Sequence, residues 1–292
     1  MGTIRAEQAN PLTAQPVELE AVVSAVAASK KYRALCEDTI RRVAAQQLAA
    51  VSSGGLRAAV KATRRRLHQA YGAFEQAFDG ESAYRRLEEA YRSGSTLEVE
   101  ATCRLVMALH QSTRERLPAI DRFYRDIWDV TGRPHTLLDV GCGLNPLALP
   151  WMSLEPDARL VALDIDRERV QWLNRYLVLA GLEPLARCQD VLAQPPGDAA
   201  DVALLLKMAP TLERQEPEAT GRLVEALRAP WVVVSFPVKS LGGHEKGMAE
   251  NYTRQFEALC RAGFHSRPAA GYGNPAYEIL RFDSELVFAV RK

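Results

Sequence analysis

A short apolar strand that leads directly into a glycine turn constrains the fold of this chain more than any other segment. Residues 136–140 read TLLDV, and Gly141-Cys142-Gly143 follow at once. Closely spaced glycines let a backbone turn tightly and come near a ligand. In an open α/β sheet, ligands bind beyond the carboxyl ends of the strands, where this turn would lie. The segment therefore predicts a ligand site at the end of the first strand of such a sheet.

The pattern downstream of this turn agrees with an α/β fold. Short β-branched runs alternate with helical spacing, which implies βαβ units and a mostly parallel sheet covered on both faces. We expect strands at 136–140, 159–165, 201–206, 231–236, 277–282 and 285–290, and helices at 170–180, 212–227 and 256–262.

Upstream of residue 133 the chain is rich in Ala, Arg, Glu and Leu at helical spacing. We expect helices at 16–48 (one or two), 56–78, 82–92, 96–110 and 114–130. This pattern places a helical, basic N-terminal domain at residues 1–112 and a Rossmann-like domain at residues 113–292. Because no apolar run reaches the ~18 residues that a membrane helix needs, and the first residues lack the apolar segment of a signal peptide, we expect a cytoplasmic protein.

Acidic residues lie at the ends of the predicted strands 136–140 and 159–165 and of a further strand region that ends at residues 189–191. Asp139 lies where a carboxylate could meet the ammonium of an amino-acid cofactor. Asp164, 21 residues after Gly143, could accept hydrogen bonds from two ribose hydroxyls, although it could also cap a helix, a role that we assign to Asp166. Asp190 could bind an adenine amino group or could simply be a turn residue. Together the three acids predict a nucleoside site.

The residues after the turn narrow the choice of nucleoside. No Gly-Lys-Ser/Thr follows, so a phosphate loop is excluded. A dinucleotide fingerprint needs a third glycine where this chain has Leu144-Asn145-Pro146, which favours S-adenosylmethionine as the cofactor. The 5 cysteines form no CxxC pair, and no His/Cys/Asp cluster has metal-ligand spacing, so we expect no metal.

Positive charge is concentrated near the N-terminus. Residues 1–70 contain 11 Lys and Arg against 5 Asp and Glu, although the whole chain carries a net charge of only +1. Such asymmetry is typical of a polyanion-binding surface, and its plainer interpretation is a solvated helical face. The candidate RNA-binding residues in this region are Lys30, Lys31, Arg33, Arg64, Arg65 and Arg66.

Several longer segments resemble one known family. They are LHQ from Leu67, HQSTRER from His110, LLDVGCGLNPLALPWM from Leu137, LLLKMAPTLERQ from Leu204 and SFPVKSLGGHEKGM from Ser235. These segments are similar to those of the aminoglycoside-resistance methyltransferases of antibiotic producers, which modify a guanine N7 in the decoding site of 16S ribosomal RNA. The fold implied is a Rossmann-like class I methyltransferase sheet, of the α/β class, with a helical N-terminal domain.

The resemblance implies roles for individual residues. It assigns the methionine end of the cofactor to His110, Gln111, Ser112 and Arg116, with Arg116 pairing with the cofactor carboxylate. It completes the pocket with Gly141, Asp164, Asp190, Val191, Leu206 and Gln215, and lays Phe74 over the cofactor. It turns Lys207, Lys239 and the 242–246 loop, with His244 and Lys246, toward the RNA and its target base. Without the family, Arg116 could be a solvated helix residue, and Ser112 with Glu115 could form a capping box.

The expected partner is 16S rRNA within the 30S subunit, approached by a monomer that flips its target base out of the stack. Guanine N7 carries no proton, so the expected reaction needs no general base and depends on alignment. Other interpretations stay open at this point. They are a small-molecule methyltransferase with the helical domain as a lid, an rRNA methyltransferase acting on a neighbouring adenine, and an RNA-binding protein without catalytic activity.

Overall fold

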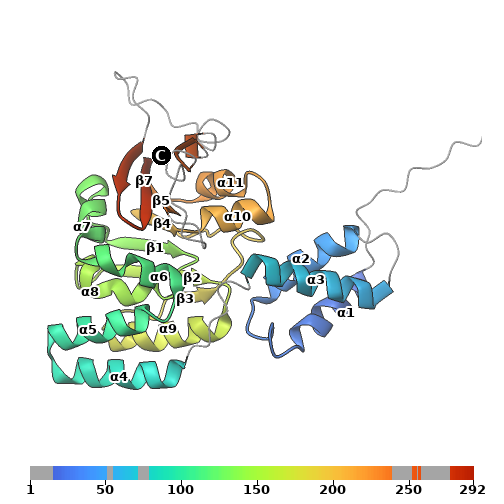
Figure 1. Cartoon of the computed structure of the whole chain (residues 1–292), viewed down its shortest axis with the longest axis horizontal. Helices are drawn as coiled ribbons and strands as arrows, with labels where there is room; N and C mark the ends of the chain where they lie inside the picture. Colours follow the sequence, from blue (N-terminus) through green and yellow to red (C-terminus); the bar gives the residue numbers. More distant parts are fainter. Residues whose placement is uncertain (1–15, 51–54, 72–78, 239–251, 255, 258–276) are drawn as a thin grey trace, which may run out of the picture. The chain divides into compact units, whose positions relative to one another are not determined.

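The computed structural model describes residues 16–50, 55–71, 79–238, 252–254, 256–257 and 277–292 (Figure 1). The chain divides into two compact units, Met1–Ala73 and Phe74–Lys292. This division of the chain falls after residue 73, whereas the boundary expected from the sequence lies after residue 112. Among the described residues, no helix combines the length and the apolar character needed to cross a bilayer.

The first unit is a small helical cluster. It contains α1 (Pro16–Ala27), α2 (Glu37–Ala50) and α3 (Gly55–Tyr71), so the predicted 16–48 region forms two helices. Its core is built from apolar residues at helical spacing, which include Val22 and Val26 of α1, Ile40 and Val43 of α2 and Leu67 of α3. The apolar face that the spacing predicts is thus the buried one.

The second unit is built on one sheet of seven strands in the order β3-β2-β1-β4-β5-β7-β6. The strands β1 to β5 run parallel, and the last two are antiparallel to their neighbours. Their bounds are β1 Thr136–Val140, β2 Arg159–Asp164, β3 Ala186–Cys188, β4 Val202–Leu206, β5 Trp231–Pro237, β6 Tyr277–Arg281 and β7 Glu285–Arg291. The predicted α/β fold with a Rossmann-like sheet is confirmed.

Alternate side chains of each strand enter two separate cores. On β1, Leu137 packs in one core and Leu138 in the other. The Leu137 face is covered by α4 (Gly80–Ser93), α5 (Thr96–Met107), α7 (Ile120–Thr131), α8 (Leu149–Met152) and α9 (Arg167–Leu179). The Leu138 face is covered by α10 (Ala209–Gln215) and α11 (Ala219–Ala226). Both faces of the sheet are therefore covered, as a largely parallel sheet requires.

The helices α4 and α5 belong to the sheet unit because they bury their apolar faces in the core that contains β1. Leu87 and Met107 are fully buried there, and the Trp172 indole of α9 donates to the Gly80 carbonyl at 2.7 Å. Asp79 caps the start of α4, because its side chain accepts a hydrogen bond from the Ser82 amide.

Two predicted helices are interrupted at prolines. The segment 114–130 forms α6 (Gln111–Arg116), a 3-10 turn (Leu117–Ala119) containing Pro118, and α7. The segment 212–227 forms α10 and α11, separated at Pro217 and at Glu218, whose φ is 61°. A proline inside a helix removes a backbone hydrogen bond and collides with the preceding turn. The predicted helix at 256–262 lies mostly outside the described residues, as do 72–78 of the predicted helix at 56–78.

Candidate cofactor site

The glycine turn after β1 is tied to the end of β2. The Cys142 amide donates to the Leu163 carbonyl at 2.9 Å, and the Gly143 amide donates to the Asp164 carboxylate at 2.9 Å. Gly141 has a φ of +66°, and a Cβ added to it would lie 2.2 Å from the sulfur of Met208. Only glycine fits this position without displacing a neighbour.

Replacement of Gly141 by alanine is expected to lower the melting temperature by several degrees and to weaken S-adenosylhomocysteine binding at least about tenfold. The left-handed conformation costs a side chain roughly 1–2 kcal/mol, and the Met208 side chain must also move. Thermal unfolding and calorimetric titration measure the two effects. Gly197→Ala is the matched control, since nothing lies within 4 Å of its added Cβ. Equal melting temperatures and affinities for the two variants would show that the turn tolerates a side chain.

The next acid, Asp164, ends β2 and is only 7% exposed. Besides the Gly143 amide it accepts the Asp166 amide at 2.9 Å, and the Arg169 guanidinium lies 3.3 Å away. Asp166 caps α9 by accepting from the Arg169 amide at 3.0 Å, so its predicted role is confirmed. Asp164 therefore shapes the turn and lies at the ligand-binding edge of the sheet.

The third acid, Asp190, follows β3 and is 2% exposed. It accepts the Leu192 amide at 2.9 Å and the Ala193 amide at 3.3 Å. These two bonds show that Asp190 stabilises the turn that follows β3. Its contact with adenine stays a prediction. The adjacent Val191 and the last residue of β4, Leu206, are both buried, at 7% and 8% exposure.

The first acid, Asp139, is buried within β1 at 1% exposure. It accepts a hydrogen bond from the Asn145 side-chain amide at 2.9 Å. Burial raises the pKa of Asp139 to about 7, against the lowering effects of Asn145 and Arg116, and the charge of Asp164 adds to the rise. This carboxyl group is therefore poised to change its charge near neutral pH.

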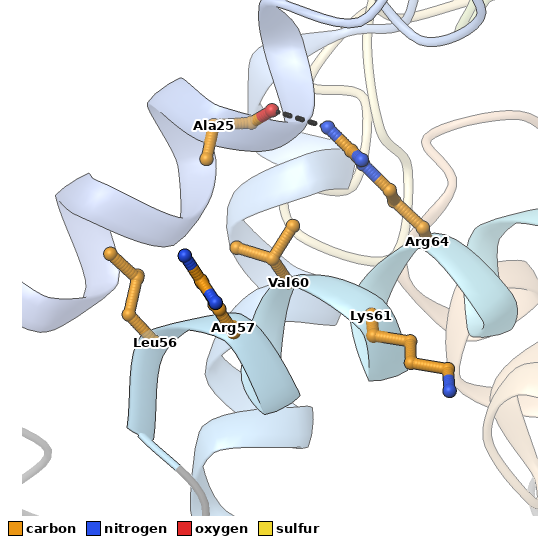
Figure 2. A pocket seen from close by; sticks show the side chains of 6 residues that line it. All are labelled: Ala25, Leu56, Arg57, Val60, Lys61 and Arg64. Carbon is orange, nitrogen blue, oxygen red and sulfur yellow. Dashed lines mark hydrogen bonds between the residues drawn. The ribbon is translucent and has the colours of Figure 1, made fainter.

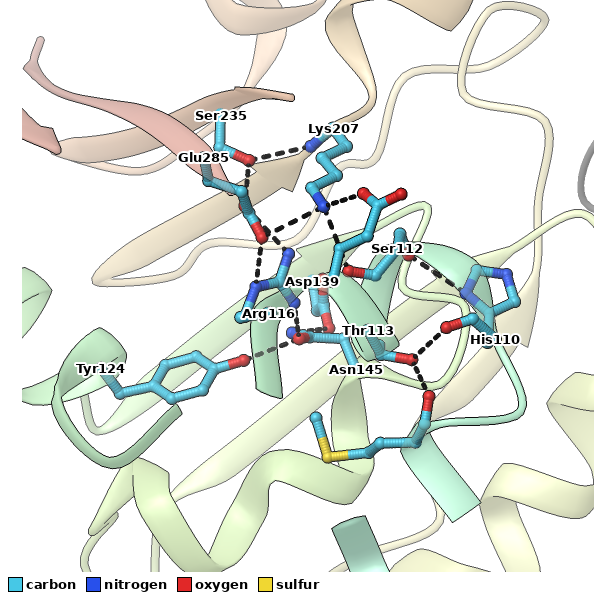
Figure 3. A network of polar contacts seen from close by, with 12 residues as sticks. His110, Ser112, Thr113, Arg116, Tyr124, Asp139, Asn145, Lys207, Ser235 and Glu285 are labelled. Carbon is cyan, nitrogen blue, oxygen red and sulfur yellow. Dashed lines mark hydrogen bonds and ion pairs between the residues drawn. The ribbon is translucent and has the colours of Figure 1, made fainter. Parts of the chain in front are cut away.

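A buried ion pair joins α6 to β7, the last strand along the chain (Figure 3). Arg116 donates to both oxygens of Glu285, at 2.8 and 3.1 Å, and the two side chains are 1% and 0% exposed. The Ser235 hydroxyl donates to Glu285 at 2.7 Å. Burial by itself would raise the pKa of Glu285, but Arg116 and Lys207 bring it below its ordinary value. Glu285 is therefore a carboxylate, and Arg116 is not a solvated helix residue.

Lys207 extends this cluster from the end of β4. Its ammonium contacts Glu115 at 2.6 Å, Glu285 at 3.5 Å and the Ser112 carbonyl at 3.3 Å. Its φ of 59° is uncommon for a residue other than glycine. The predicted capping box is wrong, because Ser112 lies inside α6 and Glu115 instead contacts Lys207 and the Gln111 amide, the latter at 3.1 Å.

His110 stands at the N-terminal end of α6 and is 8% exposed. Its Nδ1 lies 3.0 Å from the Ser112 hydroxyl, and its ring lies beside Gly143, where it would be 3.0 Å from an added Cβ. Burial lowers the pKa of His110 to about 4, helped by Arg169, with the charge of Asp164 opposing the shift. The imidazole is therefore neutral at pH 7.

The structure thus brings several predicted pocket residues to one edge of the sheet: His110, Gln111, Ser112, Arg116, Asp139, Gly141 and Asp164. Lys207, predicted to face the target base, lies beside them. Gln215 lies on α10, where its amide donates to the Thr211 carbonyl at 3.3 Å. Phe74, Lys239, His244 and Lys246 lie outside the described residues. In the described ranges, no group of three or more His, Cys, Asp or Glu side chains could hold a metal ion.

Four residues of this site were not predicted: Tyr124, Asn145, Ser235 and Glu285. A signal existed for Glu285, because a charged residue that opens an otherwise apolar strand (ELVFAV) needs a partner if it is buried. Asn145 lies inside the GCGLNP segment. At this position the sequence shows only that the third glycine of a dinucleotide fingerprint is missing.

The candidate RNA-binding residues of the first unit lie on its surface. Lys30, Lys31, Arg33, Arg64 and Arg65 are exposed and Arg66 is half-buried. A shallow depression of about 400 Å³ is lined by Ala25 of α1 and by Leu56, Arg57, Val60, Lys61 and Arg64 of α3. Figure 2 shows Arg64 reaching across to the Ala25 carbonyl, to which it donates at 2.8 Å. The first unit therefore presents several cations around α3.

The residues at this edge of the sheet fit the cofactor expected from the sequence. A tight turn at Gly141, which has no room for a side chain beside Met208, and a buried acid at Asp139 suit a nucleoside that carries a cationic group. With the strand order and the acid-terminated strands, these features define a class I methyltransferase. The chain belongs to the FmrO family of ribosomal RNA methyltransferases, whose family model matches residues 28–266.

Known relatives match nearly the whole chain. A 16S rRNA (guanine(1405)-N(7))-methyltransferase of Micromonospora rosea is 39% identical over 276 residues, covering 94% of this chain and 97% of the relative. One of the same name from Frankia casuarinae is 40% identical, with 85% and 88% covered. The crystal structure of the 16S rRNA methyltransferase RmtF in complex with S-adenosyl-L-homocysteine superposes with a TM-score of 0.75 at 31% identity, covering 95% of this chain and 99% of that one.

Proposed function

We propose that this protein transfers a methyl group from S-adenosylmethionine to N7 of guanine 1405 in 16S rRNA, and so confers resistance to aminoglycosides. The observation that carries the proposal is the identity of 39% with a guanine-1405 N7 methyltransferase over 94% of the chain. The buried acids and the glycine turn of the candidate site supply the chemistry that such an enzyme needs. A small-molecule substrate and a neighbouring adenine are the alternatives that the experiment below separates.

Within this proposal, two groups of residues hold the cofactor. Asp164 binds the ribose hydroxyls and Asp190 the adenine amino group, with Gly141, Val191, Leu206 and Gln215 completing the nucleoside end. Asp139, His110, Gln111, Ser112 and Arg116 line the methionine end, and Phe74 covers it. The support for these assignments is the convergence of the described members of the set on one edge of the sheet.

The reaction needs little from the protein beyond alignment. When bound, S-adenosylmethionine supplies a methyl group activated by its sulfonium. Guanine N7 offers a lone pair and carries no proton, so the nitrogen–carbon bond forms as the sulfur–carbon bond breaks, and no side chain has to remove a proton. His110 is neutral, and this reaction gives it no proton to accept. The side chains of the site orient the two partners and exclude water.

The first unit is proposed to bind RNA, with Lys30, Lys31, Arg33, Arg64, Arg65 and Arg66 contacting phosphates. In the second unit Lys207 and Lys239, with His244 and Lys246, are proposed to face the flipped base. Extrusion of a paired base costs a few kcal/mol, and phosphate contacts can supply that free energy. The partner proposed is the 30S subunit, bound by a single copy of the chain.

The test uses 30S subunits from an aminoglycoside-sensitive bacterium and cofactor labelled in its methyl group. We expect label in 16S rRNA, at guanine 1405, and blocked reverse transcription there after chemical cleavage at 7-methylguanine. A sensitive host that expresses the protein should grow on gentamicin and kanamycin. Label at an adjacent adenine would replace the proposed target, and label found only in soluble metabolites would refute the RNA substrate.

A further inference from the structure

The Asp139 carboxyl group has one oxygen without a partner among the described residues. Its Oδ2 accepts the Asn145 amide at 2.9 Å, while no described residue donates to Oδ1. The side chain is nevertheless 1% exposed. Among the described residues, the only fully buried side-chain N or O atom without a partner is Thr39 Oγ1, so Asp139 Oδ1 is the part of this carboxyl group that stays open to a ligand. The position therefore calls for a ligand group that donates hydrogen bonds and carries positive charge.

Asn145 can orient this carboxyl group because its own amide is held in one orientation. Its Oδ1 accepts from the Tyr124 hydroxyl at 2.6 Å and from the Arg116 guanidinium at 2.5 Å (Figure 3). Both of these groups donate here, so only the amide oxygen can face them. The NH₂ group must then face Asp139. The backbone supports this arrangement, since the Asn145 amide donates to the Cys142 carbonyl at 2.8 Å.

We propose that Asn145 is a positioning residue, which orients the Asp139 carboxylate so that its free oxygen receives the ammonium of the methionine portion of the cofactor. The inference rests on the proposed use of S-adenosylmethionine and on the proposed place of Asp139 at its methionine end, and it adds the residue that orients this acid. Asn145 acts through Asp139 and has no contact with the reacting atoms in this scheme. Tyr124 and Arg116, in turn, keep the Asn145 amide from flipping.

The charge state of Asp139 links this arrangement to pH. The groups that face it are Arg116 from α6, Tyr124 from α7, Cys142 of the turn and Asp164 from β2. Its pKa of about 7 means that the carboxylate form becomes dominant as the pH rises through neutrality. Loss of the Asn145 donor removes an effect that lowers this pKa, so the transition should move to higher pH.

Two ligands separate the ammonium from the rest of the cofactor. S-adenosylhomocysteine carries the amino-acid portion, whereas 5′-methylthioadenosine lacks it. By calorimetry with the full chain, Asn145→Ala should weaken S-adenosylhomocysteine about tenfold, the effect of one lost hydrogen bond to a charged group. Its affinity for 5′-methylthioadenosine should stay within twofold of the unsubstituted protein. Equal weakening of both ligands, or of neither, would overturn the proposal.

A double-mutant cycle tests whether Asn145 acts through Asp139. Asp139→Asn should show the same ligand-selective loss, and adding Asn145→Ala to it should cause little further loss. Fully additive effects would mean that Asn145 acts independently, which also overturns the proposal. Should the alanine variant fail to fold, Asn145→Asp provides the same test, because its carboxylate has the same shape and keeps an acceptor for Tyr124 and Arg116 but has no N–H to donate to Asp139.

The pH profile gives a readout that a purely structural role would not change. In the unsubstituted protein, S-adenosylhomocysteine affinity should rise about tenfold between pH 6 and pH 8, and 5′-methylthioadenosine affinity should stay level. Asn145→Ala should shift the rise to higher pH, and an unshifted rise would count against the positioning role. Because these are binding measurements, a failure of methyl transfer to 16S rRNA would refute the proposed substrate and leave this inference standing.

Discussion

Replacement of Asp164 by alanine is expected to weaken S-adenosylhomocysteine binding about a hundredfold, the effect of losing two hydrogen bonds from ribose hydroxyls to a buried carboxylate. The variant also removes the acceptor for the Gly143 amide and one of the two carboxylates that the Arg169 guanidinium contacts. Methyl transfer at subsaturating cofactor should fall by at least the same factor. Calorimetry and initial rates measure the two quantities.

The control for this prediction is Asp166→Ala. Asp166 lies two residues away and caps α9, so the variant loses about 1 kcal/mol of stability while the proposed ribose ligand remains. Asp164→Asn keeps an acceptor oxygen for the turn but loses the charge, so it separates turn geometry from nucleoside recognition. An Asp164→Ala protein that bound S-adenosylhomocysteine within threefold of the unsubstituted chain would invalidate the pocket assignment.

Glu285→Gln is expected to be the most destabilising conservative substitution at the site. Removal of one partner from a buried ion pair costs about 3–5 kcal/mol, because the other charge stays buried without compensation. Here that charge is Arg116, at 1% exposure. For a chain of this size the melting temperature should fall by roughly 10 °C. Thermal and urea unfolding, followed by circular dichroism, measure the change.

Glu278→Gln is the matched control, since Glu278 is exposed on the neighbouring strand β6 and should leave the melting temperature within 1–2 °C, as surface substitutions usually do. The double variant Arg116→Met with Glu285→Leu removes both charges and should recover part of the stability lost in Glu285→Gln. It should still bind S-adenosylhomocysteine poorly if Arg116 meets the cofactor carboxylate. An unchanged melting temperature for Glu285→Gln would mean that the pair contributes nothing to the folded state.

The parts of the site that could be predicted are those with local sequence signals. The strand and glycine turn at residues 136–143 form a continuous segment, and each acid follows its own apolar run, so their meeting at one edge follows from parallel strands alone. The two proline interruptions, at Pro118 and Pro217, also had a local signal. The helical spacing of apolar residues continues across both prolines, so the sequence predicted one helix at each place where the structure has two.

The remaining parts depend on contacts between distant segments. No local pattern pairs Arg116 with Glu285, because the pairing requires β7 to lie beside β5 and α6 to lie over the same edge. The Tyr124–Asn145–Asp139 chain likewise joins a helix, a turn and a strand. The boundary between the compact units could not be read from composition, because α4 and α5 look like the helices before them and differ only in the core that they enter.

The Arg116–Glu285 pair also has a consequence for the order of assembly. Its partners are 169 residues apart along the chain, and loops of that length close late in folding because their entropy must be lost before the contact is gained. Helices and neighbouring parallel strands can form without this ion pair. The charges of Arg116 and Glu285, in contrast, compensate each other only after these two distant segments have met. Recovery of cofactor affinity during refolding is therefore a measure of completed topology, and it should lag behind recovery of helical structure.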